Sequence, residues 1–229
     1  MLYDERAVKE NIRNRQGKRV FILGKQDTLT PSARDYLSRE RIAILPPEEA
    51  KPQRWKLLNG GHVEDKPEHM THLDGDTLVP KTHPRIRFRG AVDTLEAELL
   101  LCGSVVGDVL TLTRRLIRCD VLNEPVGDIT LYGLTEAQQR EHSHFPQKYY
   151  GIPHFMPDFS DSEQLLRLNR ARCAARAAEL AAAEAFADRE GNPTRPDILT
   201  ACNRISSMLY LLMLQQRSKN QTKAHRPSH

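Results

Sequence analysis

The sequence predicts a mainly α fold, a five-helix bundle preceded by a small N-terminal α+β lobe. Three observations lead to this prediction. Residues 161–190 contain neither Pro nor Gly and are rich in Ala, Leu, Arg and Glu, which favour a long helix. Charged residues make up 28% of the chain and aromatic residues only 6%, which suits helices better than a β-sandwich. The last helix repeats apolar residues every three or four positions, as a bundle core requires: Ile198, Cys202, Ile205, Leu209 and Leu212.

The accessory lobe is expected to span residues 1–65. Residues 19–23 and 41–45 are predicted to be strands, because each is an Arg followed by four apolar residues. Between them Thr30 can cap a helix, with Pro31 at its first position. The Asn59-Gly60-Gly61 turn then predicts a short hairpin.

The bundle is expected to span residues 66–216. Helices are predicted over 91–103 and 104–122, and a short one after Thr135, a capping residue. A His-, Phe-, Tyr- and Pro-rich loop follows, of the kind found at a ligand mouth. The long helix then ends before Gly191, and Pro196 opens the last helix. Residues 217–229 form a basic tail that we expect to be disordered.

Composition argues against several classes of protein. The net charge of +4 is small and dispersed, and no nucleic-acid-binding motif is present, so we expect no nucleic-acid partner. The N-terminus lacks an apolar signal core and no apolar run approaches a membrane span, so we expect a cytoplasmic protein without a membrane partner. The four cysteines form no CxxC pair, which argues against a zinc ribbon and a disulfide scaffold.

A charged stripe runs along the long helix. Arg172, Arg176 and Glu179 lie at i, i+4 and i+7, on one side of the helix and between small Ala residues. Because buried charge is costly unless it is paired, the stripe is either an ion-pair network or the wall of a ligand site. Asn203 interrupts the apolar face of the last helix, and must be hydrogen-bonded to a neighbouring helix or to a ligand.

The extended segment of residues 70–85 is a third polar region. Its backbone NH groups, together with Thr71 and Lys81, could cradle phosphates, although the segment is no Walker sequence. His69 and His72 are weak metal candidates, because no Cys or carboxylate accompanies them at a fixed spacing.

Taken together, these motifs resemble a known family. The pattern R-x-x-x-R-x-A-E from Arg172 to Glu179, the N-R-x-S of residues 203–206, and a Lys followed by G-A-V-D-T-L at residues 90–95 are similar to the ATP:corrinoid adenosyltransferases of the propanediol-utilisation type. The ethanolamine-utilisation branch is more similar still. It shares L-T-P-S-A-R, T-H-L, R-P-D-I-L and N-R-x-S-S, which stand here at residues 29–34, 71–73, 195–199 and 203–207.

The resemblance implies a homotrimer of five-helix bundles, with MgATP bound between subunits and cobalamin beside it. It further implies roles for single residues. ATP would be held by Thr71, His72, Lys81, Arg176, Glu179 and Asn203. Asp93 and Arg172 would form a salt bridge between subunits, and Phe155, with His154 as a competing candidate, would face the corrinoid.

The activity implied is transfer of the 5′-deoxyadenosyl group of ATP to the cobalt of cobalamin, in ethanolamine utilisation. The enzyme would be free in the cytoplasm or attached to a microcompartment. A corrinoid reductase and an adenosylcobalamin-dependent lyase would be its partners. The sequence departs from the branch in one respect: His62 is followed by V-E-D-K and not by a cysteine-containing metal loop, so we expect no structural iron or zinc.

Two other functions remain open. The chain could be a non-catalytic corrinoid-binding or assembly protein with the same bundle, because the glycine-rich phosphate loop of the propanediol type is missing. It could also be a purely structural bundle, in which the polar residues of the two long helices satisfy one another.

Overall fold

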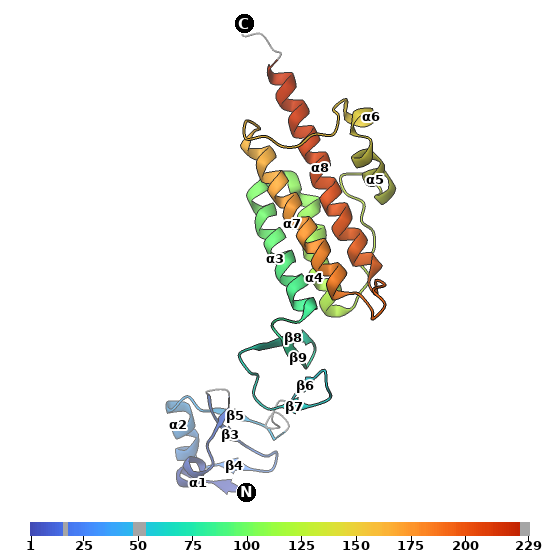
Figure 1. The fold of residues 1–229 in the computed structure, drawn as a ribbon. Coiled ribbons are helices and arrows are strands. Elements are labelled where there is room, and N and C mark those ends of the chain that lie inside the picture. Colours follow the sequence, from blue (N-terminus) through green and yellow to red (C-terminus); the bar gives the residue numbers. More distant parts are fainter. Residues whose placement is uncertain (16–17, 48–53, 225–229) are drawn as a thin grey trace. The chain divides into compact units, whose positions relative to one another are not determined.

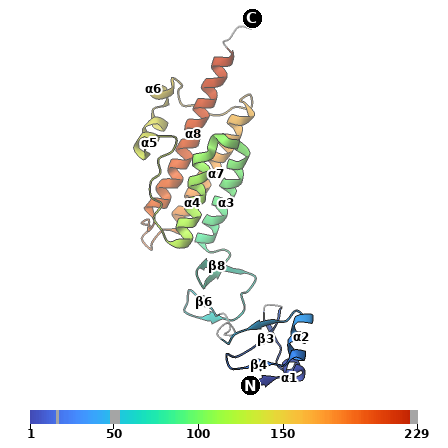
Figure 2. The same ribbon diagram turned by 180° about the vertical axis from the view of Figure 1, so that it is seen from behind.

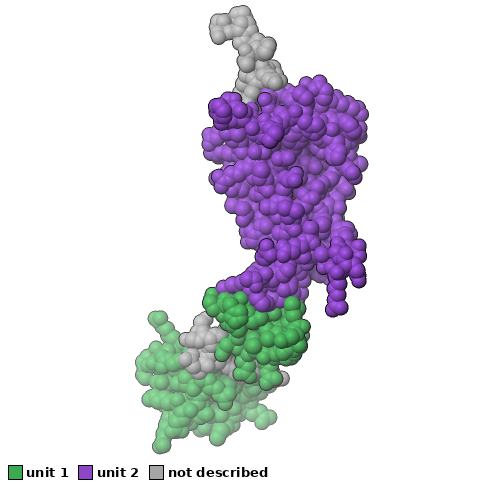
Figure 3. All heavy atoms as spheres, in the orientation of Figure 1, with its two compact units in different colours: residues 1–70, 76–78 green, residues 71–75, 79–229 purple. Residues whose placement is uncertain are grey.

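The structure is a computed structural model that describes residues 1–15, 18–47 and 54–224 (Figure 1). It divides into two compact units, coloured separately in Figure 3. The first contains residues 1–70 and 76–78, and the second contains residues 71–75 and the chain from residue 79 onward. The sequence had placed this boundary between residues 65 and 66.

The first unit is the α+β lobe. Strands β3 and β5 confirm the two predicted strands and pair in parallel, Val20 opposite Ala43. Helix α2 connects them, and the Thr30 side chain caps it by accepting a hydrogen bond from the Ala33 N–H at 3.3 Å. The lobe has its own small core of Val8, Phe21, Ala33, Leu37 and Ile42. Its elements are β1 (Leu2–Tyr3), α1 (Glu5–Glu10), β2 (Arg13–Arg15), β3 (Lys18–Ile22), β4 (Thr28–Leu29), α2 (Pro31–Arg39) and β5 (Ala43–Leu45).

A separate sheet follows along the chain, in the order β7-β6-β9-β8. The predicted hairpin is confirmed, because β6 (Trp55–Leu57) and β7 (His62–Val63) pair antiparallel across a turn in which Gly60 has a φ of 83°. β8 (Met70–Asp74) and β9 (Thr77–Pro80) flank Gly75, whose φ of 44° favours glycine. The division between the two units falls within β8 and β9.

The second unit is the helical bundle. Its long helices α3, α4, α7 and α8 lie side by side, as the opposite views of Figures 1 and 2 show. The predicted five helices correspond to α3, α4, α5, α7 and α8, and α6 is an additional short helix. Together with the lobe they confirm the predicted mainly α fold. The bounds are α3 (Pro84–Cys102), α4 (Gly107–Leu122), α5 (Glu136–His144), α6 (Pro146–Tyr150), α7 (Glu163–Ala185) and α8 (Pro196–Ala224).

The interior of the bundle explains why α7 is rich in alanine. Ala171, Ala175, Ala178 and Ala182 are completely buried, spaced by four, three and four residues. Such a stripe of small side chains allows the neighbouring backbones to approach closely, and α7 packs against both α3 and α8.

The helix ends differ from the sequence prediction in three places. α3 begins at Pro84 and not near residue 91, because the Nδ1 atom of His83 caps it by accepting from the Arg85 N–H at 3.2 Å. α7 ends at Ala185, before the predicted end at residue 190. α8 continues to Ala224, so residues 217–224 are helical where a disordered tail was predicted. No Pro or Gly interrupts residues 197–226, so nothing in the sequence forces the helix to stop earlier.

One property of the helices bears on membranes. None of the helices in the described ranges combines the length and the apolar character that crossing a membrane requires.

Candidate active site

A polar cavity of about 290 Å³ lies on the second unit, where α7 and α8 face the segment around residues 143–155. Two arginines and no acidic residue line it, so an anion is the ligand that its charge favours. The volume is close to the lower end of the range, roughly 300–1,000 Å³, that is usual for ligand pockets. The lining residues are Ser143, His144, His154, Phe155, Arg172, Arg176, Asn203, Ser206, Ser207 and Tyr210.

The α7 wall of the cavity carries Arg172 and Arg176, one helical turn apart. Arg176 is exposed, and it forms no ion pair with any acid in the described part of the chain. Arg172 is half-buried, with its guanidinium 5.7 Å from the ring centroid of Tyr210. Arg170, by contrast, points to another side of α7 and is paired with Glu98 at 2.8 Å. Within one chain the ligand-wall interpretation of the stripe therefore fits its two arginines, whereas Arg170, outside the stripe, is paired.

The α8 wall carries Asn203, whose amide is held at both ends. Its Nδ2 donates to the Glu179 carboxylate at 2.7 Å, and its Oδ1 accepts from the Arg204 guanidinium. Only one orientation of the amide satisfies both neighbours, because a carboxylate only accepts and a guanidinium only donates. The second Nδ2 hydrogen and the second Oδ1 lone pair remain for a ligand. Glu179 itself does not line the cavity, and its carboxylate accepts from Asn203 instead.

Arg204 is the most buried charged group near the cavity, with 8% of its surface exposed. Burial lowers the pKa of its guanidinium, and its Nε and Nη1 atoms are buried without a hydrogen-bond partner in the described structure. An unpaired buried cation is costly, and the Asn203 amide oxygen supplies one hydrogen bond to this guanidinium.

The third wall brings Phe155 and His154 against α8. The Phe155 ring lies 5.9 Å from the Tyr210 ring, and the Arg217 guanidinium lies 4.2 Å from the Phe155 ring centroid. His154 stacks on Tyr210 with 14° between the planes. A second, largely apolar cavity of about 460 Å³ shares His144 and His154 with the polar one. Its lining residues are His144, Phe145, Pro146, Gln147, Lys148, Pro153 and His154.

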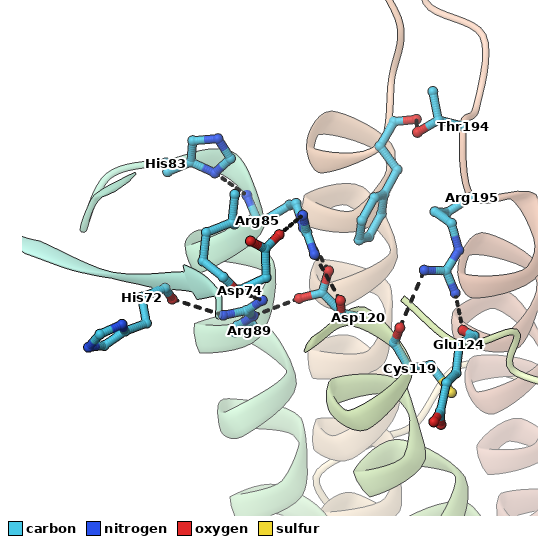
Figure 4. Close-up of polar contacts among 12 residues, drawn as sticks. His72, Asp74, His83, Arg85, Arg89, Cys119, Asp120, Glu124, Thr194 and Arg195 are labelled. Carbon is cyan, nitrogen blue, oxygen red and sulfur yellow. Dashed lines mark hydrogen bonds and ion pairs between the residues drawn. The ribbon is translucent and has the colours of Figure 1, made fainter. Parts of the chain in front are cut away.

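Thr71, His72 and Lys81 lie elsewhere in the fold. Thr71 and His72 belong to β8, Lys81 follows β9, and none of the three lines the polar cavity. Arg89 of α3 fixes this segment by donating to the carbonyl oxygen of His72 at 3.2 Å (Figure 4). It also donates to the carbonyl oxygen of Leu73 at 2.7 Å.

Arg89 belongs to a closed ionic cluster at the start of α3. The Asp120 carboxylate of α4 is completely buried and accepts from Arg85 at 2.7 Å and from Arg89 at 2.6 Å. Arg85 also lies 3.7 Å from Asp74 of β8 (Figure 4). The cluster thus connects β8, α3 and α4 and positions the segment that holds Thr71 and His72.

Comparison with known proteins identifies the family. The family model described as cobalamin adenosyltransferase matches residues 63–216. The corrinoid adenosyltransferase EutT of Salmonella typhimurium is 32% identical over 84% of each chain. The protein of the same name from Escherichia coli K12 is 30% identical over 81% of each chain.

The chain belongs to the cobalamin adenosyltransferase family.

In this family member, the side chains of Asp93 and Arg172 form no ion pair within one chain. Asp93 is exposed on α3, and the structure shows no ion pair between it and Arg172. The salt bridge inferred from the resemblance was one between subunits, so it stays a prediction.

Sequence reasoning missed several residues that line the cavity of this adenosyltransferase-family chain. Ser143, His144, Ser206, Ser207 and Tyr210 were not predicted as site residues. A signal for two of them was available, since Ser206 and Tyr210 lie three and seven positions after Asn203 and therefore share its side of α8. No comparable signal marks Ser143 or His144, which lie at the end of α5 and line the cavity because that helix packs against α8.

The described residues contain no group of three or more His, Cys, Asp or Glu side chains placed to hold a metal ion.

Proposed function

We propose that the chain is an ATP:cob(I)alamin adenosyltransferase, which transfers the 5′-deoxyadenosyl group of ATP to the cobalt of a corrinoid and releases triphosphate. The observation that carries the proposal is the acid-free cavity, in which Arg172 and Arg176 have no carboxylate partner among the described residues. In a member of the cobalamin adenosyltransferase family, the triphosphate of ATP is the anion that such a cavity fits.

The arginines would act on the leaving group. The electron pair of Co(I) forms the Co–C bond with the 5′ carbon of ATP, and the C–O bond to the triphosphate breaks, so triphosphate leaves with that bond's electron pair. Arg176 and the Mg²⁺ that arrives with ATP would stabilise the charge that develops on it, while Arg172 would order the site beside them. Each charge-assisted hydrogen bond to phosphate contributes about 1.5–3 kcal/mol.

Asn203 would fix the position of the nucleotide. Glu179 and Arg204 already set its amide orientation before any ligand arrives, so its free hydrogen and lone pair are aimed without further ordering. Such preorganisation matters because in-line attack on the 5′ carbon depends on holding the reacting atoms near their attack geometry.

A homotrimer would complete the site. Lys81 and the Thr71-His72 segment do not line the polar cavity of their own chain. We propose that they reach the cavity of a neighbouring subunit and contact ATP there, and that Asp93 pairs with Arg172 across the same interface.

The corrinoid would lie on the side of Phe155. The apolar cavity adjoins the polar one through His144 and His154, so a large apolar substrate and a polar one could be held next to each other. An apolar contact in place of the lower axial ligand of cobalt favours reduction to Co(I), and Phe155 is the residue we propose for that contact.

The biological setting is a further part of the proposal. We place the enzyme in ethanolamine utilisation, in the cytoplasm or on a microcompartment. A corrinoid reductase would supply Co(I), and an adenosylcobalamin-dependent lyase would use the product. The EutT name of the relatives supports this setting.

An anaerobic assay tests the activity. The purified chain is mixed with chemically reduced cob(I)alamin and MgATP, and the absorption spectrum of the alkylated cobalamin is followed. We expect adenosylcobalamin and triphosphate in equal amounts. Cobalamin binding without formation of a Co–C bond would instead support a non-catalytic corrinoid-binding or assembly protein.

A further inference from the structure

Tyr210 lies at the centre of the contacts between α8 and the 154–155 segment. Its hydroxyl is 3.2 Å from the His154 Nδ1 atom and 3.4 Å from the Phe155 backbone nitrogen. The other ring nitrogen of His154, Nε2, lies 3.1 Å from the His144 carbonyl oxygen. Tyr210 and the His154 imidazole therefore hold the backbone at Phe155 and connect the 154–155 segment to His144, the last residue of α5.

The chemistry of the partners sets the direction of each hydrogen bond. A carbonyl oxygen only accepts, so the His154 Nε2 atom carries the hydrogen and donates it to His144. In the neutral imidazole Nδ1 is then the acceptor, and the Tyr210 hydroxyl donates to it. The hydroxyl oxygen accepts in turn from the Phe155 N–H. Each donor in this chain of bonds meets an acceptor.

This arrangement separates the roles of two neighbouring residues. We propose that Tyr210 and His154 are positioning residues that fix the backbone at Phe155, and that His154 does not ligate cobalt. The inference rests on the proposed function. A ring nitrogen can bind a metal only through a free lone pair, and neither nitrogen of His154 has one, since Nε2 carries a hydrogen and Nδ1 accepts from Tyr210.

Tyr210 also connects the two halves of the site. The guanidinium of Arg172, on the nucleotide side, lies over its ring, while its hydroxyl holds the backbone of Phe155 on the corrinoid side. Asn203 and Tyr210 are seven positions apart on α8, so both face the same cavity. A change at the hydroxyl is therefore expected to alter the corrinoid side and leave the ring contact with Arg172 in place.

The Tyr210→Phe substitution tests the positioning role, because it keeps the ring and removes only the hydroxyl. In an assay that starts from cob(II)alamin and a reductant, we expect kcat to fall roughly tenfold, while KM for ATP stays within about twofold of the wild-type value. Tyr150→Phe is the matched control, since it removes a hydroxyl 3.3 Å from the His142 Nδ1 atom, outside the cavity. The control is expected to keep kcat within about twofold.

The outcomes decide the inference separately from the proposed function. If the wild type forms no adenosylcobalamin, the proposed function fails and the inference fails with it. If the wild type is active and Tyr210→Phe has the kcat of the wild type, only the inference is overturned. Should Tyr210→Phe not fold, His154→Phe replaces it, because that change keeps a stacked ring and removes both imidazole hydrogen bonds.

Electron paramagnetic resonance tests cobalt ligation directly. The wild-type protein is loaded with MgATP and cob(II)inamide, which has no lower base of its own, so a cobalt-bound nitrogen would have to come from the protein. We expect no nitrogen splitting of the cobalt lines. A splitting that changes when the protein is made with [15N]histidine would overturn the assignment of His154.

Discussion

Two arginine clusters in the bundle differ in what meets their charges. Arg85 and Arg89 converge on the Asp120 carboxylate, which is completely buried and accepts from both (Figure 4). Arg172 and Arg176 instead line a cavity that contains no acid. Both pairs of arginines stand one helical turn apart on their helix, so spacing alone does not distinguish them.

The difference lies in the partner on the neighbouring helix. A carboxylate on α4 closes the first cluster, and the resulting ion pairs tie β8 to α3. The neighbouring surface of the second cluster offers hydroxyls, an amide and an aromatic ring, which leave positive charge available to a ligand. We call Arg85, Arg89 and Asp120 the closed cluster, and Arg172 and Arg176 the open cluster. Breaking the closed cluster should lower the stability of the fold, and removing an arginine of the open cluster should weaken ligand binding.

The largest effect is expected when the closed cluster is broken. Asp120→Ala leaves Arg85 and Arg89 partly buried without their anion, so the free energy of unfolding should fall by about 3–5 kcal/mol, as measured by urea denaturation. Glu184→Ala is the control, because it breaks an exposed pair with Arg87 that contributes at most about 1 kcal/mol. Equal losses in the two variants would contradict the distinction.

Removing an arginine of the open cluster should lower activity and leave stability almost unchanged. Arg176→Ala removes an exposed side chain, so the melting temperature should hardly change, whereas kcat/KM for ATP should fall roughly 10- to 150-fold. Arg170→Ala, on the same helix but paired with Glu98 away from the cavity, serves as the control and should retain activity. If the Arg176 variant kept full activity, the open cluster would not be the site.

A smaller effect on stability is expected from Cys202, which directly precedes the cavity residue Asn203 on α8 but is buried in the core. Burial, and secondarily the Glu179 carboxylate, raises the pKa of the Cys202 thiol to about 12. In the unfolded chain a thiol ionises near pH 8.5. The folded state thus retains a proton that the unfolded state loses, and the stability contribution present below pH 8.5 is lost as pH rises.

The expected loss between pH 7 and 9.5 is about 1.4 kcal/mol of unfolding free energy. The measurement is the difference between wild type and Cys202→Ala in urea denaturation at both pH values, which cancels the contributions of other titrating groups. Identical pH dependence in the two proteins would show that the thiol ionises equally well in the folded state.

Much of the bundle could be predicted from the sequence, because its signals are local. The apolar repeat that begins at Ile198 and the alanine stripe of α7 each specify a helix face without knowledge of its partner. The pairing of Arg172 and Arg176 with Asn203 across two helices followed from motif resemblance, and the structure brings these side chains to one cavity.

What escaped prediction depends on contacts between distant segments. Asp120 reads as an ordinary charged residue of a helix, and only the packing of α3 against α4 shows that it is buried between two arginines. Tyr210 lies on the predicted face of α8, but its role depends on where the loop containing His154 returns to the helix. Neither the path of a loop nor the choice of an ion-pair partner can be read from helical periodicity.

Binding of inorganic triphosphate tests most directly whether the open cluster is the site of the leaving group. Isothermal titration with magnesium triphosphate isolates this contact from the corrinoid and the nucleoside. We predict that the wild type and Arg170→Ala bind it, in competition with ATP, and that Arg176→Ala binds at least about tenfold more weakly. Equal affinity in all three proteins would contradict the account.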